Sequence, residues 1–170
     1  MSNKCIYQPS GAAREYGAWA CNLYNGCRHQ CDYCYCRRGV WKNVLGVDKP
    51  VLKAMVGNDE EEAFLTFRQE LLQHRDEILK AGTGLFFSFS TDPMQREEIA
   101  LTMRCVQECR IEQVPVQILT KATWWTKEGN TMEGDYLRQL VAWRDYVTVG
   151  VTLTGHDELE PGAPTNKERI

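Results

Sequence analysis

The chain has 170 residues, of which 43% are hydrophobic and 25% charged, and its formal net charge is -3. This composition predicts one soluble globular domain with a sizeable core, and it excludes a fibrous chain or a densely basic nucleic-acid-binding surface. The first residues lack the apolar run of a signal peptide, and no stretch approaches the roughly 18 apolar residues of a membrane span, so we expect a cytoplasmic protein.

Charge is unevenly distributed along the sequence. Residues 1–57 contain 8 Lys or Arg and 3 Asp or Glu, whereas residues 58–170 contain 12 and 20. The basic part includes Arg28, Arg37, Arg38 and Lys42. These side chains form either a solvated face or a rim that favours an anionic substrate or an acidic electron donor.

The N-terminal third is predicted to contain one strand and two irregular segments. Residues 1–16 are a polar lead-in, and the core domain is expected over residues 17–170. Residues 17–24 are typical of a strand, which the Asn25-Gly26 pair ends. Residues 39–57 contain Pro50 and three glycines and are interpreted as an insertion or lid-like loop.

The rest of the chain alternates predicted helices and strands. Asn58 or Asp59 caps a first helix. A strand over residues 85–90 ends at Thr91-Asp92-Pro93, which offers a helix start. Strands over 115–121 and 146–154 flank a Gly-rich loop at 129–134 and a third helix. The apolar positions expected to face the core are Phe64, Phe67, Leu71, Ile78, Leu79, Ile99, Thr102, Met103, Val106, Cys109, Tyr136, Leu137, Leu140 and Val141.

This order predicts an α/β fold with parallel strands, right-handed crossovers and burial of strands two to four on both faces. Residues 155–164 are loop-like, and residues 165–170 resemble the first turn of a helix. No helix is predicted to cover the fourth strand. We therefore expect either a truncated copy of a longer domain or a partner, such as a second copy, over that exposed edge.

The most specific motif is a loop with three cysteines spaced C-x3-C-x2-C: Cys27, Cys31 and Cys34. In a chain without secretion signals, such thiols indicate a metal centre rather than disulfides. Three protein ligands leave one coordination position of the metal centre open to a substrate or cofactor. The alternatives are a non-catalytic iron-sulfur or zinc module, with Cys36 or Cys21 as fourth ligand, and a degenerate fragment that binds nothing tightly. Cys105 and Cys109, four apart on a predicted helix, are interpreted as buried thiols.

The cysteine spacing, with Tyr33 before the last cysteine, resembles the radical S-adenosylmethionine superfamily. The wider context looks like the branch around spore photoproduct lyase; it comprises residues 22–27, 34–35, 90–93 and 117–121. The resemblance implies a partial parallel (β/α) barrel, with about four βα units of the six in the family. It also implies a [4Fe-4S] cluster on Cys27, Cys31 and Cys34, with S-adenosylmethionine chelating the fourth iron.

The resemblance further implies an enzyme that cleaves S-adenosylmethionine into methionine and a 5'-deoxyadenosyl radical, which abstracts hydrogen from an unknown substrate. An electron donor such as flavodoxin or ferredoxin would be a partner. Nucleic acid is a partner by family likeness only. Tyr33 would pack on the adenine, the backbone of Tyr35 would bond its edge, and Ser88 and Ser90 would meet the methionine amino group.

By the same resemblance, Lys121 would engage the cofactor carboxylate, and Thr152, or else Thr154, would meet the same end of the cofactor. The alternatives are that Ser88 and Ser90 bond to backbone and that Lys121 is a surface charge. One position departs from the lyase pattern. Phe89 stands where the lyase has a hydrogen-donating cysteine, so repair of thymine lesions is not expected, and Cys36 is interpreted as a bystander thiol.

Overall fold

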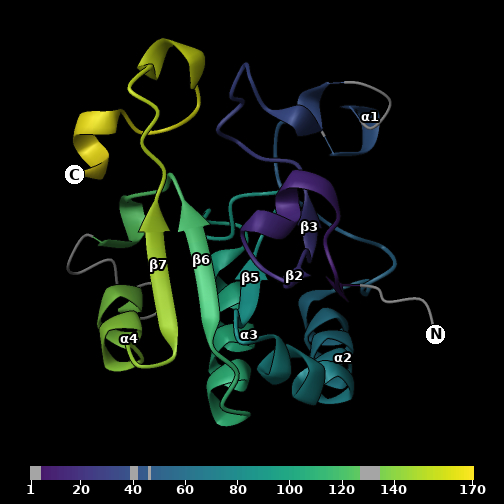
Figure 1. Cartoon of the computed structure of the whole chain (residues 1–170). Helices are drawn as coiled ribbons and strands as arrows, with labels where there is room; N and C mark the ends of the chain where they lie inside the picture. Colours follow the sequence, from purple (N-terminus) through teal and green to yellow (C-terminus); the bar gives the residue numbers. More distant parts are fainter. Residues whose placement is uncertain (1–4, 39–41, 46, 127–134) are drawn as a thin grey trace.

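The computed structural model of the chain describes residues 5–38, 42–45, 47–126 and 135–170. Its main sheet has strand order β1-β2-β5-β6-β7. β1 pairs antiparallel with β2, and the other neighbouring strands are parallel. The fold is therefore α/β with a mostly parallel central sheet, as predicted (Figure 1). The strands are β1 (Ile6–Tyr7), β2 (Trp19–Cys21), β5 (Leu85–Phe87), β6 (Val116–Thr120) and β7 (Val147–Val151).

Helices α2 (Glu60–Ala81), α3 (Ile99–Ile111) and α4 (Tyr136–Ala142) connect consecutive parallel strands (Figure 1). The predicted start of α2 is confirmed, because the Asp59 carboxylate accepts the backbone N–H of Glu62 at 2.8 Å. Gly82 ends this helix in the left-handed conformation, at φ 75°. None of the helices in the described part of the chain is long and apolar enough to cross a membrane.

The core lies between the helices and one face of the sheet. Leu85 and Phe87 of β5 are buried beside Val116 and Ile118 of β6, and the Phe87 ring centroid lies 6.0 Å from that of Phe67 in α2. The prediction of strands buried on both faces is wrong for part of the sheet. Side chains of β6 alternate between buried and half-buried, and Val151 at the end of β7 is 42% exposed.

The N-terminal region differs from the prediction in two places. The segment predicted as a polar lead-in, residues 1–16, supplies β1, in which Ile6 is buried next to Cys5; the Glu70 carboxylate accepts both of their backbone N–H groups. The predicted strand over 17–24 ends at Cys21. The chain then bends, and β3 (Tyr24–Asn25) pairs with β4 (Val51–Leu52) in a separate two-stranded sheet.

The predicted insertion at 39–57 contributes β4 and the short helix α1 (Lys42–Leu45); residues 39–41 and 46 lie outside the described part. The predicted Gly-rich loop at 129–134 also lies outside it. A helix start at residues 91–93 is wrong, because the Asp92 side chain turns inward to accept hydrogen bonds and α3 begins at Ile99. The predicted fourth strand ends at Val151, before residues 152–154.

Candidate metal and cofactor site

Residues 27–36, here called the cysteine loop, follow β3 and lie near the carboxyl ends of β5 and β6 (Figure 1). Gly26 turns the chain into the loop at φ 87°, and a Cβ there would lie 2.3 Å from the carbonyl oxygen of Lys49. The backbone N–H of Cys27 then donates to the carbonyl of Val47 at 3.0 Å. The loop therefore needs glycine at its start, because both the conformation and the close approach exclude a side chain.

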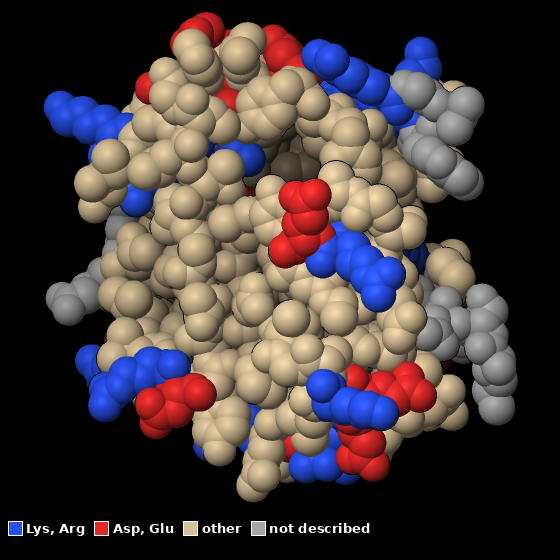
Figure 2. Space-filling view, viewed as in Figure 1, with Lys and Arg blue, Asp and Glu red and all other residues tan. Residues whose placement is uncertain are grey.

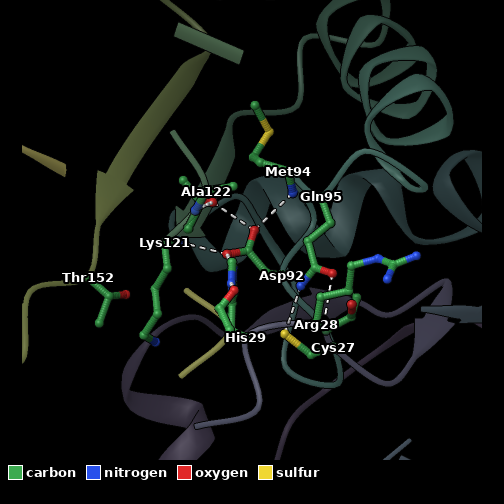
Figure 3. A network of polar contacts seen from close by, with 12 residues as sticks. Cys27, Arg28, His29, Asp92, Met94, Gln95, Lys121, Ala122 and Thr152 are labelled. Atoms are coloured by element: carbon green, nitrogen blue, oxygen red, sulfur yellow. Dashed lines mark hydrogen bonds and ion pairs between the residues drawn. The ribbon is translucent and has the colours of Figure 1, made fainter. Parts of the chain in front are cut away.

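A buried His–Asp pair joins the cysteine loop to the sheet (Figure 3). His29 Nε2 and Asp92 Oδ2 are 2.7 Å apart. The same carboxylate accepts the backbone N–H of Lys121 at 2.7 Å, the Thr120 hydroxyl at 2.7 Å and the backbone N–H of Met94 at 3.0 Å. Burial alone would raise the pKa of Asp92, but the hydrogen bonds from His29 and β6 outweigh burial and lower it.

Gln95 contacts the cysteine loop through both atoms of its amide group (Figure 3). Its Oε1 accepts the backbone N–H of Arg28 at 3.0 Å, and its Nε2 donates to Cys27 Sγ at 2.8 Å. The side chain is 4% exposed. A buried amide donor directed at a cysteine sulfur favours an electron-rich sulfur, which is the form that binds metals.

The predicted site residues surround a cavity of about 420 Å³. Figure 2 shows a hollow on the face seen in Figure 1, in the half of the molecule toward which β6 and β7 point. Of the ten predicted site residues, only Thr154 does not line this cavity. Those that do are Cys27, Cys31, Cys34, Tyr33, Tyr35, Ser88, Ser90, Lys121 and Thr152.

The three motif cysteines lie in different electrostatic environments. The pKa of Cys34 is lowered to about 6, chiefly by a hydrogen bond from the neighbouring Cys36 thiol, and Lys121 contributes to the same shift. Burial raises the pKa of Cys27 to about 12 and also raises that of Cys31. Cys34 is therefore the thiol of the three that loses its proton first, whereas a bound cation would be needed to deprotonate Cys27 near neutral pH.

The other cysteines divide into two groups. Cys36 lines the cavity, and its Sγ lies 3.6 Å from the carbonyl oxygen of Phe89. Cys21 is fully buried in the core beside Cys5 and lies outside the cavity lining, so the structure does not support it as a fourth ligand. Cys105 and Cys109 on α3 are fully buried, as predicted.

Within the described residues, no group of three or more His, Cys, Asp or Glu side chains is arranged to hold a single metal ion. A single zinc ion requires all of its donor atoms within about 2.3 Å of the metal. A [4Fe-4S] cluster takes each thiolate on a different iron, so its ligands stand farther apart. The cavity is lined by three cysteines, which is the number of thiolate ligands that such a cluster would need here. The Gln95 amide would donate a hydrogen bond to one of these ligands, Cys27.

Residues 155–170, here called the C-terminal segment, pack against the cysteine loop. The backbone N–H of Asp32 donates to the Leu159 carbonyl at 2.8 Å, and the backbone N–H of Gly162 donates to the His29 carbonyl at 3.0 Å. A Cβ at Gly162 would lie 1.9 Å from the carbonyl oxygen of Arg28. The segment therefore fits closely over the loop, which the sequence did not predict.

A buried carboxylate of this segment contacts two predicted cofactor residues. Glu160 accepts the Tyr33 hydroxyl and lies 3.7 Å from Lys121 Nζ. Its second oxygen is 2.7 Å from Nη2 of Arg169, and both side chains are fully buried. Burial alone would raise the pKa of Glu160, but the hydrogen bond from Tyr33 and the ion pair with Arg169 outweigh it and lower the pKa. The Lys121, Arg169 and Glu160 side chains together therefore carry a net charge of +1.

The serine and tyrosine side chains of the predicted site already have partners. The Ser88 hydroxyl donates to the Thr91 carbonyl at 3.0 Å, and the Ser90 hydroxyl donates to the Tyr24 carbonyl at 2.5 Å. Tyr35 donates from its hydroxyl to the Phe89 carbonyl at 2.6 Å. The alternative anticipated for the serines, bonding to backbone, is therefore observed, and each serine hydroxyl keeps acceptor capacity toward the cavity.

The sequence reasoning missed four residues that organise the site: His29, Asp92, Gln95 and Glu160. His29 had a signal, because it stands between two motif cysteines, where a non-ligand polar residue tends to support the ligands. The other three lie outside the motif. Comparison of the chain with protein-family models, with curated proteins and with solved structures found no match.

Proposed function

We propose that this protein is a radical S-adenosylmethionine enzyme that binds a [4Fe-4S] cluster through Cys27, Cys31 and Cys34. The observation that carries the proposal is the shared cavity: the three cysteines line the same 420 Å³ space as Tyr33 and Lys121. These five residues come from the cysteine loop and the end of β6. A cofactor that touches the cluster would therefore also reach the residues that the family resemblance assigns to it.

Lys121 is the residue best suited to the cofactor carboxylate. Its side chain is 16% exposed, and the Lys121, Glu160 and Arg169 side chains together carry one net positive charge. One bound carboxylate would neutralise this charge in a partly dry site, where the attraction is stronger than in water. The Tyr33 ring lies 5.7 Å from Lys121 Nζ and is 41% exposed, so one face of it is free to pack against a base.

When bound, the cluster would supply the electron that splits the sulfonium of S-adenosylmethionine and so starts hydrogen abstraction from a substrate. The residues of this chain orient the cofactor and exclude water. Phe89 cannot return a hydrogen atom, so the proposal does not include repair of thymine lesions. Arg28 and Arg37 are neutralised by Glu97 and Asp48, whereas Arg38 bonds to the backbone carbonyl of Asp32 and keeps its charge. An acidic electron donor such as flavodoxin or ferredoxin would meet Arg38.

The strand order of the main sheet is also consistent with the proposed class of enzyme. The parallel order β2-β5-β6-β7 is compatible with a partial barrel of the radical S-adenosylmethionine type, with the outer edge of β7 available to a second copy of the chain. The cytoplasm, where thiols stay reduced, is the compartment that suits the proposed cluster.

Anaerobic reconstitution of the full chain with iron and sulfide tests the proposal. We expect about four irons per chain, a reduced cluster detectable by paramagnetic resonance, and a spectral change on adding S-adenosylmethionine. Cys31→Ala should abolish the cluster, whereas Cys105→Ala, a buried thiol outside the cavity, should retain it. Assembly of the same cluster in the Cys31→Ala variant would refute the three-ligand assignment.

A second candidate function is a non-catalytic iron-sulfur or zinc module with four thiolates. It rests on the position of Cys36, which lines the cavity and hydrogen-bonds to Cys34. Cys36→Ala distinguishes the two functions. A three-cysteine site keeps its cluster and its response to S-adenosylmethionine in this variant, whereas a closed four-thiolate site loses the metal and shows no such response in the wild-type chain.

A further inference from the structure

The surroundings of Gln95 fix the orientation of its side-chain amide group. This residue lies between the inward-turned Asp92 and the start of α3, and its backbone carbonyl accepts the backbone N–H groups of Glu98 and Ile99, both at 3.0 Å. The side chain is 4% exposed. Because the Arg28 backbone offers a donor, Oε1 must face Arg28, and Nε2 therefore faces the sulfur of Cys27 (Figure 3).

From this geometry we infer that Gln95 is a positioning residue that raises the reduction potential of the cluster bound through Cys27, an inference that rests on the proposed function. One-electron reduction adds negative charge to the cluster and its thiolates. The N–H dipole points its positive end at Cys27 Sγ and stabilises the reduced state more than the oxidised state. Burial strengthens the effect, because no water competes for the sulfur and the local dielectric constant is low.

The two contacts of Gln95 separate a structural role from an electronic one. The bond from Arg28 N–H to Oε1 fixes the conformation of the loop next to Cys27, and a carboxylate could accept it equally well. The bond from Nε2 to the sulfur needs an N–H donor. Gln95→Glu therefore keeps the first contact and removes the second, and it also places a negative charge beside the cluster. Gln95→Leu removes both contacts without adding charge.

The experiment is a redox titration of the anaerobically reconstituted full chain, followed by paramagnetic resonance of the reduced cluster. We expect the midpoint potential of Gln95→Leu to shift to a more negative value than the wild type, and that of Gln95→Glu to shift further in the same direction. The matched control is Gln117→Glu, which adds the same charge at a glutamine whose amide donates to the Thr83 carbonyl. Its potential should equal that of the wild type.

Equal potentials in the wild type and both Gln95 variants would overturn the inference and leave the proposed function intact. Absence of a cluster in the wild-type chain would overturn both. If neither Gln95 variant assembled a cluster, pulsed paramagnetic resonance on the wild type with side-chain ¹⁵N-labelled glutamine would decide. Because Gln30 also lines the cavity, the measurement is repeated on a Gln30→Leu variant. Coupling between a glutamine nitrogen and the reduced cluster that persists in this variant supports the inference, and its absence overturns it.

Discussion

Two regions of the molecule are held together by different forces. The sheet and helices α2 and α3 form a core of apolar side chains, including Phe67, Phe87 and Ile118, each at most 2% exposed. The cysteine loop is held instead by hydrogen bonds and ion pairs. These contacts join segments far apart in the sequence, because His29 bonds to Asp92, 63 positions away, and Tyr33 bonds to Glu160, 127 positions away.

The difference has a consequence for how each region responds to change. Burial of apolar area is spread over many contacts and does not depend on direction, so core positions tolerate rearrangement if volume is kept. A buried polar contact depends on one partner, and removing that partner leaves an unsatisfied group. We therefore expect core substitutions to lower global stability and substitutions around the cysteine loop to act locally.

The largest effect is expected from Phe67→Ala on α2. This side chain is fully buried against Phe87, and its truncation should lower the free energy of unfolding by about 3–5 kcal/mol, through lost burial and a cavity. Urea unfolding monitored by tryptophan fluorescence measures it. Leu65→Ala on the same helix is the control, because that side chain is 55% exposed and should change stability by less than about 0.5 kcal/mol. Similar losses in both variants would contradict the assignment of the core to this face of α2.

Arg169→Met tests the polar region. It leaves the buried carboxylate of Glu160 with only the more distant Lys121 as a cation, at a cost of about 3 kcal/mol. We expect this cost to appear as release of the C-terminal segment rather than global unfolding. Hydrogen exchange of the amide of Gly162, which bonds to the His29 carbonyl, should accelerate strongly, while exchange in β6 stays slow.

The matched control removes the exposed ion pair of Arg138 with Asp135, whose side chains are 85% and 38% exposed. Arg138→Met should change stability by less than about 1 kcal/mol. A double variant in which Glu160→Leu accompanies Arg169→Met should recover most of the protection at Gly162, because neither fully buried charge of the pair remains and Lys121 keeps some contact with water. Unchanged exchange at Gly162 in Arg169→Met would show that the ion pair does not hold the segment.

The same contrast explains which parts of the structure the sequence could predict. The N-cap at Asp59, predicted as Asn58 or Asp59, and the predicted buried face of α3 follow from local spacing. The strand over residues 116–120 was placed within one residue. Local patterns suffice there because capping and amphipathicity act over a few neighbouring residues.

The failures occur where long-range polar contacts decide the local structure. Residues 91–93 have the composition of a helix start, but Asp92 instead accepts bonds from His29 and from β6. The predicted strand over 85–90 ends at Phe87, and the Ser90 hydroxyl reaches the Tyr24 carbonyl beyond it. In the candidate site, the cysteines were recognisable from spacing alone. Gln95 and Glu160 were not, because nothing in their local sequence indicates the partner that each one contacts.

The smallest expected effect concerns Glu98, a carboxyl group at the boundary between the two regions. It is 1% exposed and accepts the Thr91 hydroxyl, and burial raises its pKa well above the ordinary value. The unfolded chain releases this proton near pH 4.3, whereas the folded chain retains it to higher pH. Between the pKa of Glu98 in the unfolded chain and its higher pKa in the folded chain, the folded state binds more protons. The free energy of unfolding therefore falls as pH rises through this range.

Glu98→Gln removes this penalty and keeps an oxygen for the Thr91 hydroxyl. The variant should match the wild type below about pH 4 and become more stable than it above that pH, a difference measured by urea unfolding across the pH range. Glu158→Gln should instead be less stable than the wild type above that pH, because backbone and His156 hydrogen bonds lower the pKa of that exposed carboxylate. A Glu98→Gln variant that becomes less stable than the wild type as pH rises would show that Glu98 is ionised in the folded state. Glu98 would then belong to the polar region and not to the apolar core.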